Sequence, residues 1–209
     1  MFGLFKTLLA KNKTLLSETD TMKKFLIIGL GNIGAEYANT RHNIGFKILD
    51  AIAKAEKLTF ETQKLGDITT LKVKGRSIIL LKPSTYMNLS GKAIKYWMEK
   101  EKIPIENMMV IADDINLPFG TIRVKTKGSD GGHNGLKDTQ NFLETTNYNR
   151  FRFGVGADFG QGRQVDYVLG EWNEEEQKEL PERFTKATEL VKSFVLSGIN
   201  RTMNQFNNS

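Results

Sequence analysis

The sequence predicts a single-domain α/β sandwich, in which a mixed but largely parallel sheet is flanked by helices. Short apolar runs bounded by turn residues, which are typical of strands, alternate along the chain with segments whose apolar residues recur at helical spacing. The length of 209 residues suits one domain with a sizeable core. We find no internal repeat, low-complexity tract or long linker that would divide the chain.

Six apolar runs are predicted to be strands, and they cover residues 25–30, 68–73, 77–81, 108–112, 121–124 and 151–155. Four helices are predicted among and after them. Asn43 is a suitable cap for the first helix, Ser90 for a second that runs through Lys100, and a third should follow Asn134. The last helix is expected to begin near Pro181, because proline is favoured in a first helical turn.

The composition limits the possible functions. A formal net charge of +6 and a pI of about 9.4 favour an anionic partner, although many basic proteins bind nothing acidic. The absence of cysteine excludes disulfides, thiolate metal sites and cysteine nucleophiles, and two histidines are too few for a histidine-rich metal site. No apolar run approaches the roughly 20 residues of a membrane span.

Residues 1–21 are expected to be an extension without an assigned role, ahead of a domain at 22–209.

Residues 29–34 (GLGNIG) follow a predicted strand and match the dinucleotide-binding fingerprint G-x-G-x-x-G. In that fingerprint a helix begins within the motif and directs its N-terminus at the pyrophosphate. Here residues 35–42 (AEYANTRH) lack apolar periodicity, and the expected acidic residue would fall near Lys54, inside a helical pattern. We therefore interpret the glycines as a tight turn that presents Asn32. A nucleotide-dependent oxidoreductase remains the alternative.

Four polar clusters follow predicted strands or precede predicted helices. They comprise Asn32 with Tyr37, Arg41, His42 and Asn43; residues 83–88 (PSTYMN); Asp113 with Asp114; and residues 128–135, which hold His133 and Asn134. Ligand sites in open α/β folds lie beyond the carboxyl ends of the strands, so the clusters are expected to meet at one rim of the sheet.

His42 is the candidate general base, and Asp113 or Asp114 could hold its second ring nitrogen. The competing interpretations are a capping histidine and turn-forming aspartates. Three amides, one from each of three clusters, could donate to an ester carbonyl and stabilise its oxyanion: Asn32, Asn88 and Asn134. A serine nucleophile is disfavoured, because the sequence has no G-x-S-x-G elbow.

These clusters resemble the motifs of the bacterial-type peptidyl-tRNA hydrolases. Residues 29–46 (GLGNIGAEYANTRHNIGF) are similar to the opening motif of that family, and residues 82–91 (KPSTYMNLSG), 112–120 (ADDINLPFG) and 128–138 (GSDGGHNGLKD) are similar to the next three. The similarity runs from Met22 almost to the C-terminus. Two positions depart from the pattern, because Ile33 stands where the family usually has proline and Asn116 where it often has aspartate.

The resemblance implies an esterase that cuts the bond between a peptide and the 3′-terminal ribose of tRNA, and so recycles tRNA from prematurely released peptidyl-tRNA. It implies that His42 activates water, that Asp113 holds His42, and that Asn32 separates blocked from free aminoacyl ends. The implied partner is tRNA carrying a peptide, with no stable protein partner, membrane, metal or cofactor. The implied setting is the cytoplasm, and the expected state is a monomer. A non-catalytic RNA-binding protein on the same fold is the second alternative.

The resemblance also implies binding residues. The tRNA end and the adjoining peptide would be bound by residues of the first, second and fourth clusters: Tyr37, Tyr86, Asn88, His133 and Asn134. Met87 would pack the floor of the pocket. Lys125 and Arg152 would form a basic pair on the 5′ phosphate of the tRNA. Phosphate contacts provide affinity without base specificity, which suits an enzyme that must accept every tRNA.

Overall fold

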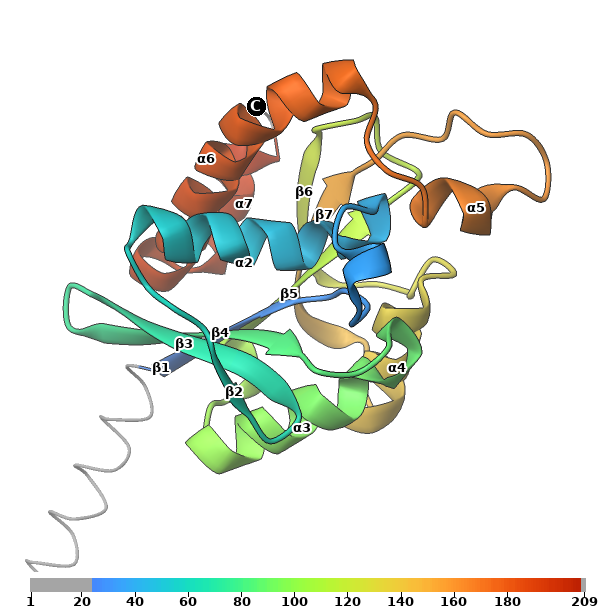
Figure 1. Cartoon of the computed structure of the whole chain (residues 1–209). Coiled ribbons are helices and arrows are strands. Elements are labelled where there is room, and N and C mark those ends of the chain that lie inside the picture. The colour runs from blue at the N-terminus through green and yellow to red at the C-terminus, as the bar shows by residue number, and fades with distance from the viewer. Residues whose placement is uncertain (1–23, 208–209) are drawn as a thin grey trace, which may run out of the picture.

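The structure is a computed structural model that describes residues 24–207, so the expected extension at residues 1–21 lies outside the described residues (Figure 1). Seven strands form one sheet in the order β2-β3-β4-β1-β5-β7-β6. The central strands β4, β1, β5 and β7 are parallel, whereas β2, β3 and β6 are antiparallel to their neighbours. The strands are β1 (Lys24–Gly29), β2 (Glu61–Gln63), β3 (Gly66–Val73), β4 (Arg76–Pro83), β5 (Met108–Asp114), β6 (Ile122–Lys127) and β7 (Asn147–Gly154).

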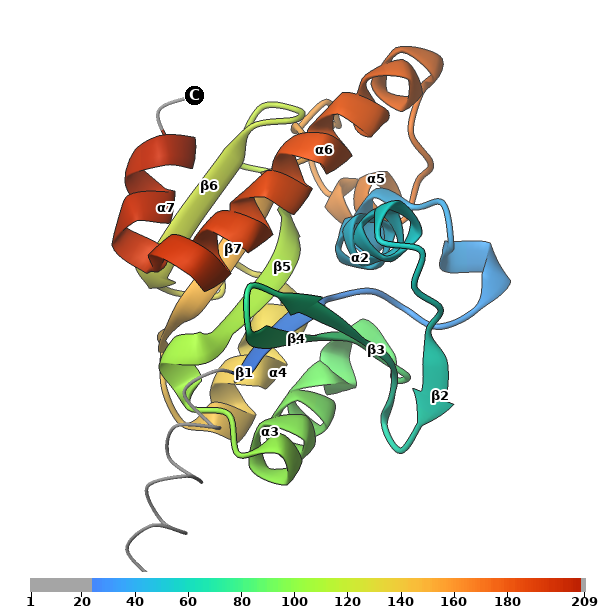
Figure 2. The same cartoon turned by 90° about the vertical axis from the view of Figure 1, so that its left-hand side faces the viewer.

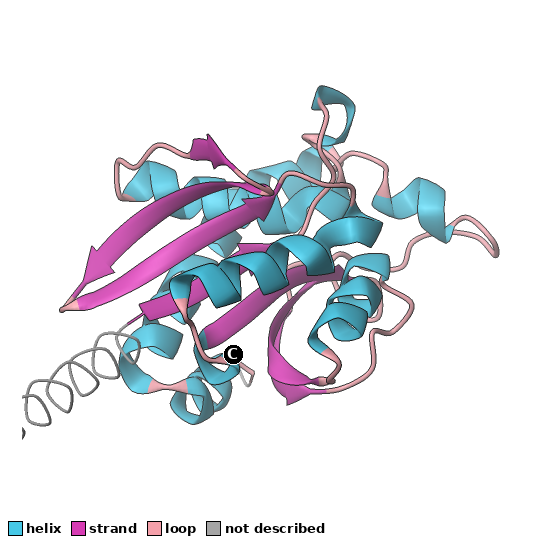
Figure 3. Ribbon diagram, turned by 90° about the horizontal axis from the view of Figure 1, so that it is seen from below, coloured by secondary structure: helices cyan, strands magenta, loops and turns pink. Residues whose placement is uncertain are grey.

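Helices cover both faces of this sheet (Figures 2 and 3). One face carries α2 (Ile44–Ala55), α6 (Glu174–Ser197) and α7 (Ile199–Phe206), and the other carries α3 (Ser90–Glu101) and α4 (Asn134–Leu143). The short helix α5 (Gln164–Val168) lies apart from both layers, and single 3-10 turns are found at η1 (Ala35–Tyr37), η2 (Arg41–Asn43), η3 (Met87–Leu89) and η4 (Ile105–Asn107). No helix in residues 24–207 combines the length and apolarity required to cross a membrane.

Two apolar cores follow from the alternation of side chains along the strands. In β1, Phe25 and Ile27 pack under α2 and α6, while Leu26 and Ile28 pack over α3 and α4. Successive side chains of a strand point to opposite faces, so the continuous apolar run of β1 supplies both cores. Each fully buried aliphatic side chain contributes about 1.5–3 kcal/mol. The central strands are thus the rigid base from which the functional loops extend.

The α/β fold with a mixed, largely parallel sheet is confirmed, and all six predicted strands are present with shifted ends. The expected start of the last helix near Pro181 is wrong, because α6 begins at Glu174 and contains the proline. Asn173 and Glu176 form a reciprocal capping box that fixes the earlier start. Besides the 3-10 turns, one strand and two helices of the described residues were not predicted: β2, α5 and α7.

The expected caps also differ in detail. Asn43 occupies the N-cap of α2, but its side chain bonds the backbone of Asn32 instead of the helix. Ser90 is the first residue of α3, and its hydroxyl donates to the carbonyl of Met87. At α4 the cap is His133 rather than Asn134, because its ring nitrogen accepts from the first backbone N–H groups of the helix.

The glycine motif opens no α-helix, since only the single 3-10 turn η1 follows Gly34 and α2 begins ten residues after it. A Cβ on Gly29 would lie 2.3 Å from the carbonyl oxygen of Gly45, and a Cβ on Gly31 would lie 2.7 Å from the ring of Phe46. These two glycines therefore allow α2 to approach β1 closely. Only Gly34, with φ of 111°, requires the backbone freedom of a turn, so the interpretation of the whole motif as a tight turn is corrected.

Candidate active site

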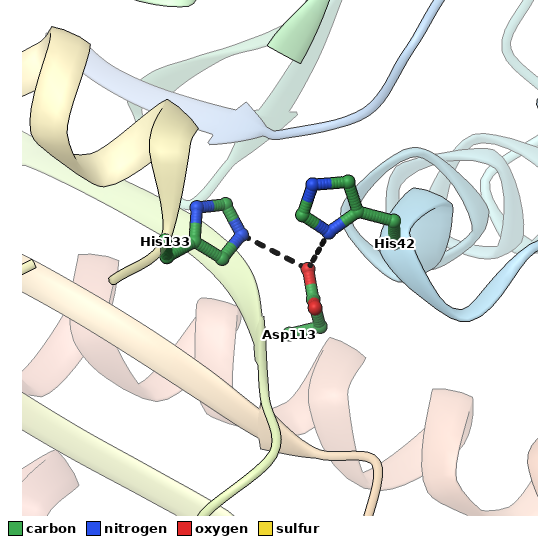
Figure 4. A group of neighbouring side chains, drawn as sticks. All are labelled: His42, Asp113 and His133. Atoms are coloured by element: carbon green, nitrogen blue, oxygen red, sulfur yellow. Dashed lines mark hydrogen bonds and ion pairs between the residues drawn. The ribbon is translucent and has the colours of Figure 1, made fainter. Parts of the chain in front are cut away.

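Three side chains from distant parts of the chain meet at the carboxyl ends of the parallel strands (Figure 4). His42 lies in η2, in the connection after β1; Asp113 lies near the end of β5; and His133 directly precedes α4. Nδ1 of His42 and Nε2 of His133 each lie 2.9 Å from the same oxygen, Oδ1 of Asp113. The carboxylate thus connects two histidines that enter from different elements.

The hydrogen bonds define the tautomers of both rings. Nδ1 of His133 accepts from the backbone N–H groups of Gly135 and Leu136, so the ring proton is on Nε2 and is donated to Asp113. An ionised carboxylate can only accept, so Nδ1 of His42 also donates to Asp113. Neutral His42 therefore has its unprotonated nitrogen, Nε2, on the side away from the carboxylate. That nitrogen is the available base.

Burial and pairing act against each other at this centre. Burial alone would raise the pKa of Asp113, which is 5% exposed, but the charges and hydrogen bonds of His42 and His133 lower it far below its usual range. Burial alone would lower the pKa of His42, but the charge of Asp113 and its hydrogen bond outweigh this effect and raise that pKa. The pairing therefore keeps Asp113 ionised and makes His42 a stronger base than an ordinary histidine.

The three side chains line a cleft of about 270 Å³. Most of the expected site residues line the same cleft: Asn32, Met87, Asn88, Asn134 and Arg152. Sequence reasoning missed one wall of it, which α5 and the residue after it form through Gln164, Val165, Val168 and Leu169. The sequence of this segment, residues 164–169 (QVDYVL), combines apolar residues with no obvious catalytic group, so it gave no signal of a site.

Asn32 is held by three hydrogen bonds. Its backbone N–H donates to Oδ1 of Asn43, its carbonyl accepts from Nδ2 of Asn43, and its Oδ1 accepts from the backbone N–H of Met87 at 2.8 Å. With the side-chain oxygen occupied, the group that Asn32 can offer to a ligand is its NH₂. The cleft therefore has a fixed hydrogen-bond donor at this position.

Asp113 and Asp114 have different partners. Asp114 accepts from the backbone N–H of Asn116 and forms an ion pair of 2.7 Å with Arg152. Since neighbouring strand residues point to opposite faces, only one of the two aspartates can reach His42. Arg152 is accordingly held at the cleft, next to the catalytic candidates.

The other expected binding residues lie farther out. Lys125 is exposed on β6 opposite Arg150 of β7, and within the described chain it lies outside the lining of the cleft. Tyr37 and Tyr86 also lie outside that lining, and Tyr86 is 51% exposed. These three residues are accessible to a large ligand that extends beyond the cleft.

The ligand atoms of His42, Asp113 and His133 lie within 4.8 Å of one another, which is close enough for a metal centre. Metal coordination would require a lone pair on each inward-facing nitrogen. Nδ1 of His133 already accepts two backbone hydrogen bonds, so a lone pair on Nε2 as well would require an imidazolate. The donor set thus fits hydrogen bonding to a carboxylate better than it fits a metal.

Comparisons with known proteins identify the family of this chain. The family model described as peptidyl-tRNA hydrolase matches residues 26–209. The peptidyl-tRNA hydrolases of Bacteroides fragilis and Phocaeicola vulgatus are 60% and 58% identical over 184 residues, which is 88% of this chain and 98% of each relative. The crystal structure of peptidyl-tRNA hydrolase from Acinetobacter baumannii superposes with a TM-score of 0.82 at 34% identity, covering 89% of this chain and 95% of that chain. The chain therefore belongs to the peptidyl-tRNA hydrolase family.

Proposed function

We propose that this protein hydrolyses the ester bond between a peptide, or an N-blocked aminoacyl group, and the 3′-terminal ribose of tRNA. The observation that carries the proposal is the hydrogen bond between His42 and Asp113 in a cleft whose lining includes the amides of Asn32, Asn88 and Asn134. This arrangement combines a general base with donors for a carbonyl oxygen, which are the two requirements of ester hydrolysis by water. Family membership supplies the substrate class.

In the proposed mechanism Nε2 of His42 removes a proton from a water molecule while the water oxygen bonds to the ester carbonyl carbon. The resulting tetrahedral intermediate collapses, the bond between that carbon and the ribose oxygen breaks, and His42 returns the proton to the leaving oxygen. Asp113 remains ionised throughout and stabilises the protonated imidazole. The products are a free peptide carboxyl group and a tRNA with an intact ribose hydroxyl.

The amides act on the carbonyl end of the substrate. Asn88 and Asn134 line the cleft beside the histidines and can donate to the oxyanion of the intermediate. The NH₂ of Asn32 can donate to the amide carbonyl of the N-acyl group on a blocked substrate, and a free aminoacyl end lacks this carbonyl. Met87 is buried and forms the floor. Selection of blocked substrates thus rests on one fixed donor.

The tRNA body would lie outside the cleft. We assign Tyr37, Tyr86 and His133 to the end of the tRNA and the peptide, and Lys125 with Arg152 to phosphate. The positive net charge of the chain supports binding to the phosphates of tRNA, which does not select among bases. We assign the activity to the domain at residues 22–209, working as a cytoplasmic monomer that returns tRNA to translation.

The test is incubation of the purified protein with N-acetyl-aminoacyl-tRNA and, separately, with free aminoacyl-tRNA. We expect rapid release of the acetylated amino acid, slow release of the free one, and no effect of a metal chelator. Binding of tRNA without release of the amino acid would support the alternative of a non-catalytic RNA-binding protein. Quenching or enhancement of nicotinamide fluorescence on titration would support the nucleotide-dependent alternative.

A further inference from the structure

Arg41, the residue before the candidate base His42, contacts a segment that is distant in the sequence, residues 167–176. Arg41 is 8% exposed, and its Nη1 donates to the carbonyl of Glu171 at 2.6 Å and to that of Tyr167 at 3.5 Å. Its Nη2 forms an ion pair of 2.7 Å with Glu176, at the start of α6. Arg41 and His42 lie in the same 3-10 turn, so this turn is joined directly to the segment around α5.

The partners of Arg41 are themselves fixed. Its guanidinium lies over the rings of Tyr167 and Trp172, with its Cζ 4.4 and 5.5 Å from their centroids. Glu176 also accepts from the backbone N–H of Asn173 in the capping box of α6. A planar, multidentate guanidinium can satisfy these partners together, whereas an ammonium group cannot. Arg41 is therefore a junction between η2, α5 and α6.

The backbone strengthens the same junction. Thr40 and Glu171 form an isolated antiparallel bridge, and the backbone N–H of Arg41 donates to the carbonyl of Gly170 at 3.0 Å. The segment after α5 is thus paired with the strand-like residues before His42. The register of this pairing determines where α5 sits along the cleft.

The wall that α5 forms has little support of its own. The helix has five residues, and a helix of that length is not stable alone in water. Residues 157–163 before it are mostly exposed, and Figure 1 shows this loop and α5 projecting from the body of the molecule. Val165 is 64% exposed although it lines the cleft. Apart from the junction at Arg41, the helix itself is held by the hydroxyl of Tyr167, which donates to the carbonyl of Val155, and by Val168, which is buried.

We propose that Arg41 is a positioning residue, which fixes the apolar wall of α5 at a set distance from His42. The inference rests on the proposed function, because the wall is taken to contact the bound substrate. Contacts made equally in the ground state and the transition state change KM and leave kcat unaltered. Loss of the junction should therefore weaken substrate binding without weakening the base.

The test compares Arg41→Lys with Arg163→Lys, which is a matched control because Arg163 is an exposed arginine at the start of α5. Neither change alters the net charge, so the long-range attraction of tRNA is preserved. In Arg41→Lys we expect KM for N-acetyl-aminoacyl-tRNA to rise about tenfold at unchanged kcat. Amide hydrogen exchange of residues 164–171 should become at least about tenfold faster, with β1 and β5 unchanged. The control should show neither effect.

Unchanged exchange in residues 164–171 would overturn the proposal, and so would faster exchange throughout the sheet, which would make Arg41 a residue of general stability. If Arg41→Lys does not fold, Glu176→Gln replaces it, since the amide oxygen still accepts from Asn173 while the ion pair is lost. A smaller shift in the same two readouts is then expected, and its absence would contradict the proposal. Hydrogen exchange is measured without substrate and does not depend on activity. An inactive wild-type protein would therefore refute the proposed function, while the exchange data would still test the role of Arg41.

Discussion

Replacement of Asp113 by asparagine separates two contributions of the carboxylate to the base, its charge and its control of the His42 tautomer. Without the negative charge, the lowering of the His42 pKa by burial is no longer opposed. An opposite charge in contact with an imidazole favours its protonated form, so loss of that charge should move the midpoint of the pH–rate profile to lower pH. The direction is downward because the protonated imidazole loses its partner.

The magnitude of the rate loss follows from the second histidine. An asparagine can turn its NH₂ toward a histidine and force the wrong tautomer, which costs about 10⁴-fold in a serine-protease triad. Here Nε2 of His133 must donate, because its Nδ1 already accepts two backbone hydrogen bonds. His133 therefore holds the amide oxygen of the Asp113→Asn side chain toward both rings. Only the basicity of His42 is lowered, so kcat should fall by less than the about 10²–10⁴-fold that general-base catalysis contributes.

The assay is single-turnover hydrolysis of N-acetyl-aminoacyl-tRNA between pH 5 and 9. Asp114→Asn is the matched control, because its carboxylate faces Arg152 and its loss should leave the pH midpoint in place. A loss of about 10⁴-fold in Asp113→Asn would refute the role given to His133. An unmoved midpoint, or a shift of equal size in Asp114→Asn, would refute the pairing of His42 with Asp113.

Three further changes test the binding residues. Asn32→Asp replaces the donor NH₂ by an acceptor, so the ratio of rates on blocked and free aminoacyl-tRNA should narrow; an unchanged ratio would place the discrimination elsewhere. Lys125→Ala should raise KM for full tRNA and flatten its salt dependence, with no effect on a short substrate that carries only the terminal adenosine. Arg152→Ala should likewise raise KM for full tRNA; an equal loss on the short substrate would mean that Arg152, which lines the cleft, supports the cleft instead of binding that phosphate.

The sheet could be predicted from the sequence because its signal is local. An apolar run such as that of β1 is buried on both faces of the sheet. Its short length favours a strand over a helix, so the run itself is sufficient to predict the element. The start of α6 was missed because a proline in a first turn and a proline inside a helix look alike in sequence. The capping box that begins eight residues before Pro181 is equally local, and the pattern of Asn173 and Glu176 is a signal that could have revealed the earlier start.

The sequence predicted those site residues whose side chains have an evident chemical role, but not the contacts between them. His42 and its carboxylate were identified as a pair, but the choice between Asp113 and Asp114 depends on which face of β5 each occupies. The contact of His133 with Asp113 is a tertiary distance of 2.9 Å that no spacing reveals. The wall of α5 was missed because apolar side chains in a short helix look like any surface turn.

The central claim is that unprotonated Nε2 of His42 accepts a proton from the attacking water. Its most direct test is the pH dependence of kcat/KM for N-acetyl-aminoacyl-tRNA, which reports the pKa of the base in the free enzyme. Since the His42 pKa is raised and a base acts when deprotonated, activity should rise with pH through a midpoint above the ordinary value of about 6.5. His42→Ala should lose about 10²–10⁴ in rate and lack that midpoint. A folded His42→Ala variant that keeps the same midpoint, or near-normal turnover, would contradict the account.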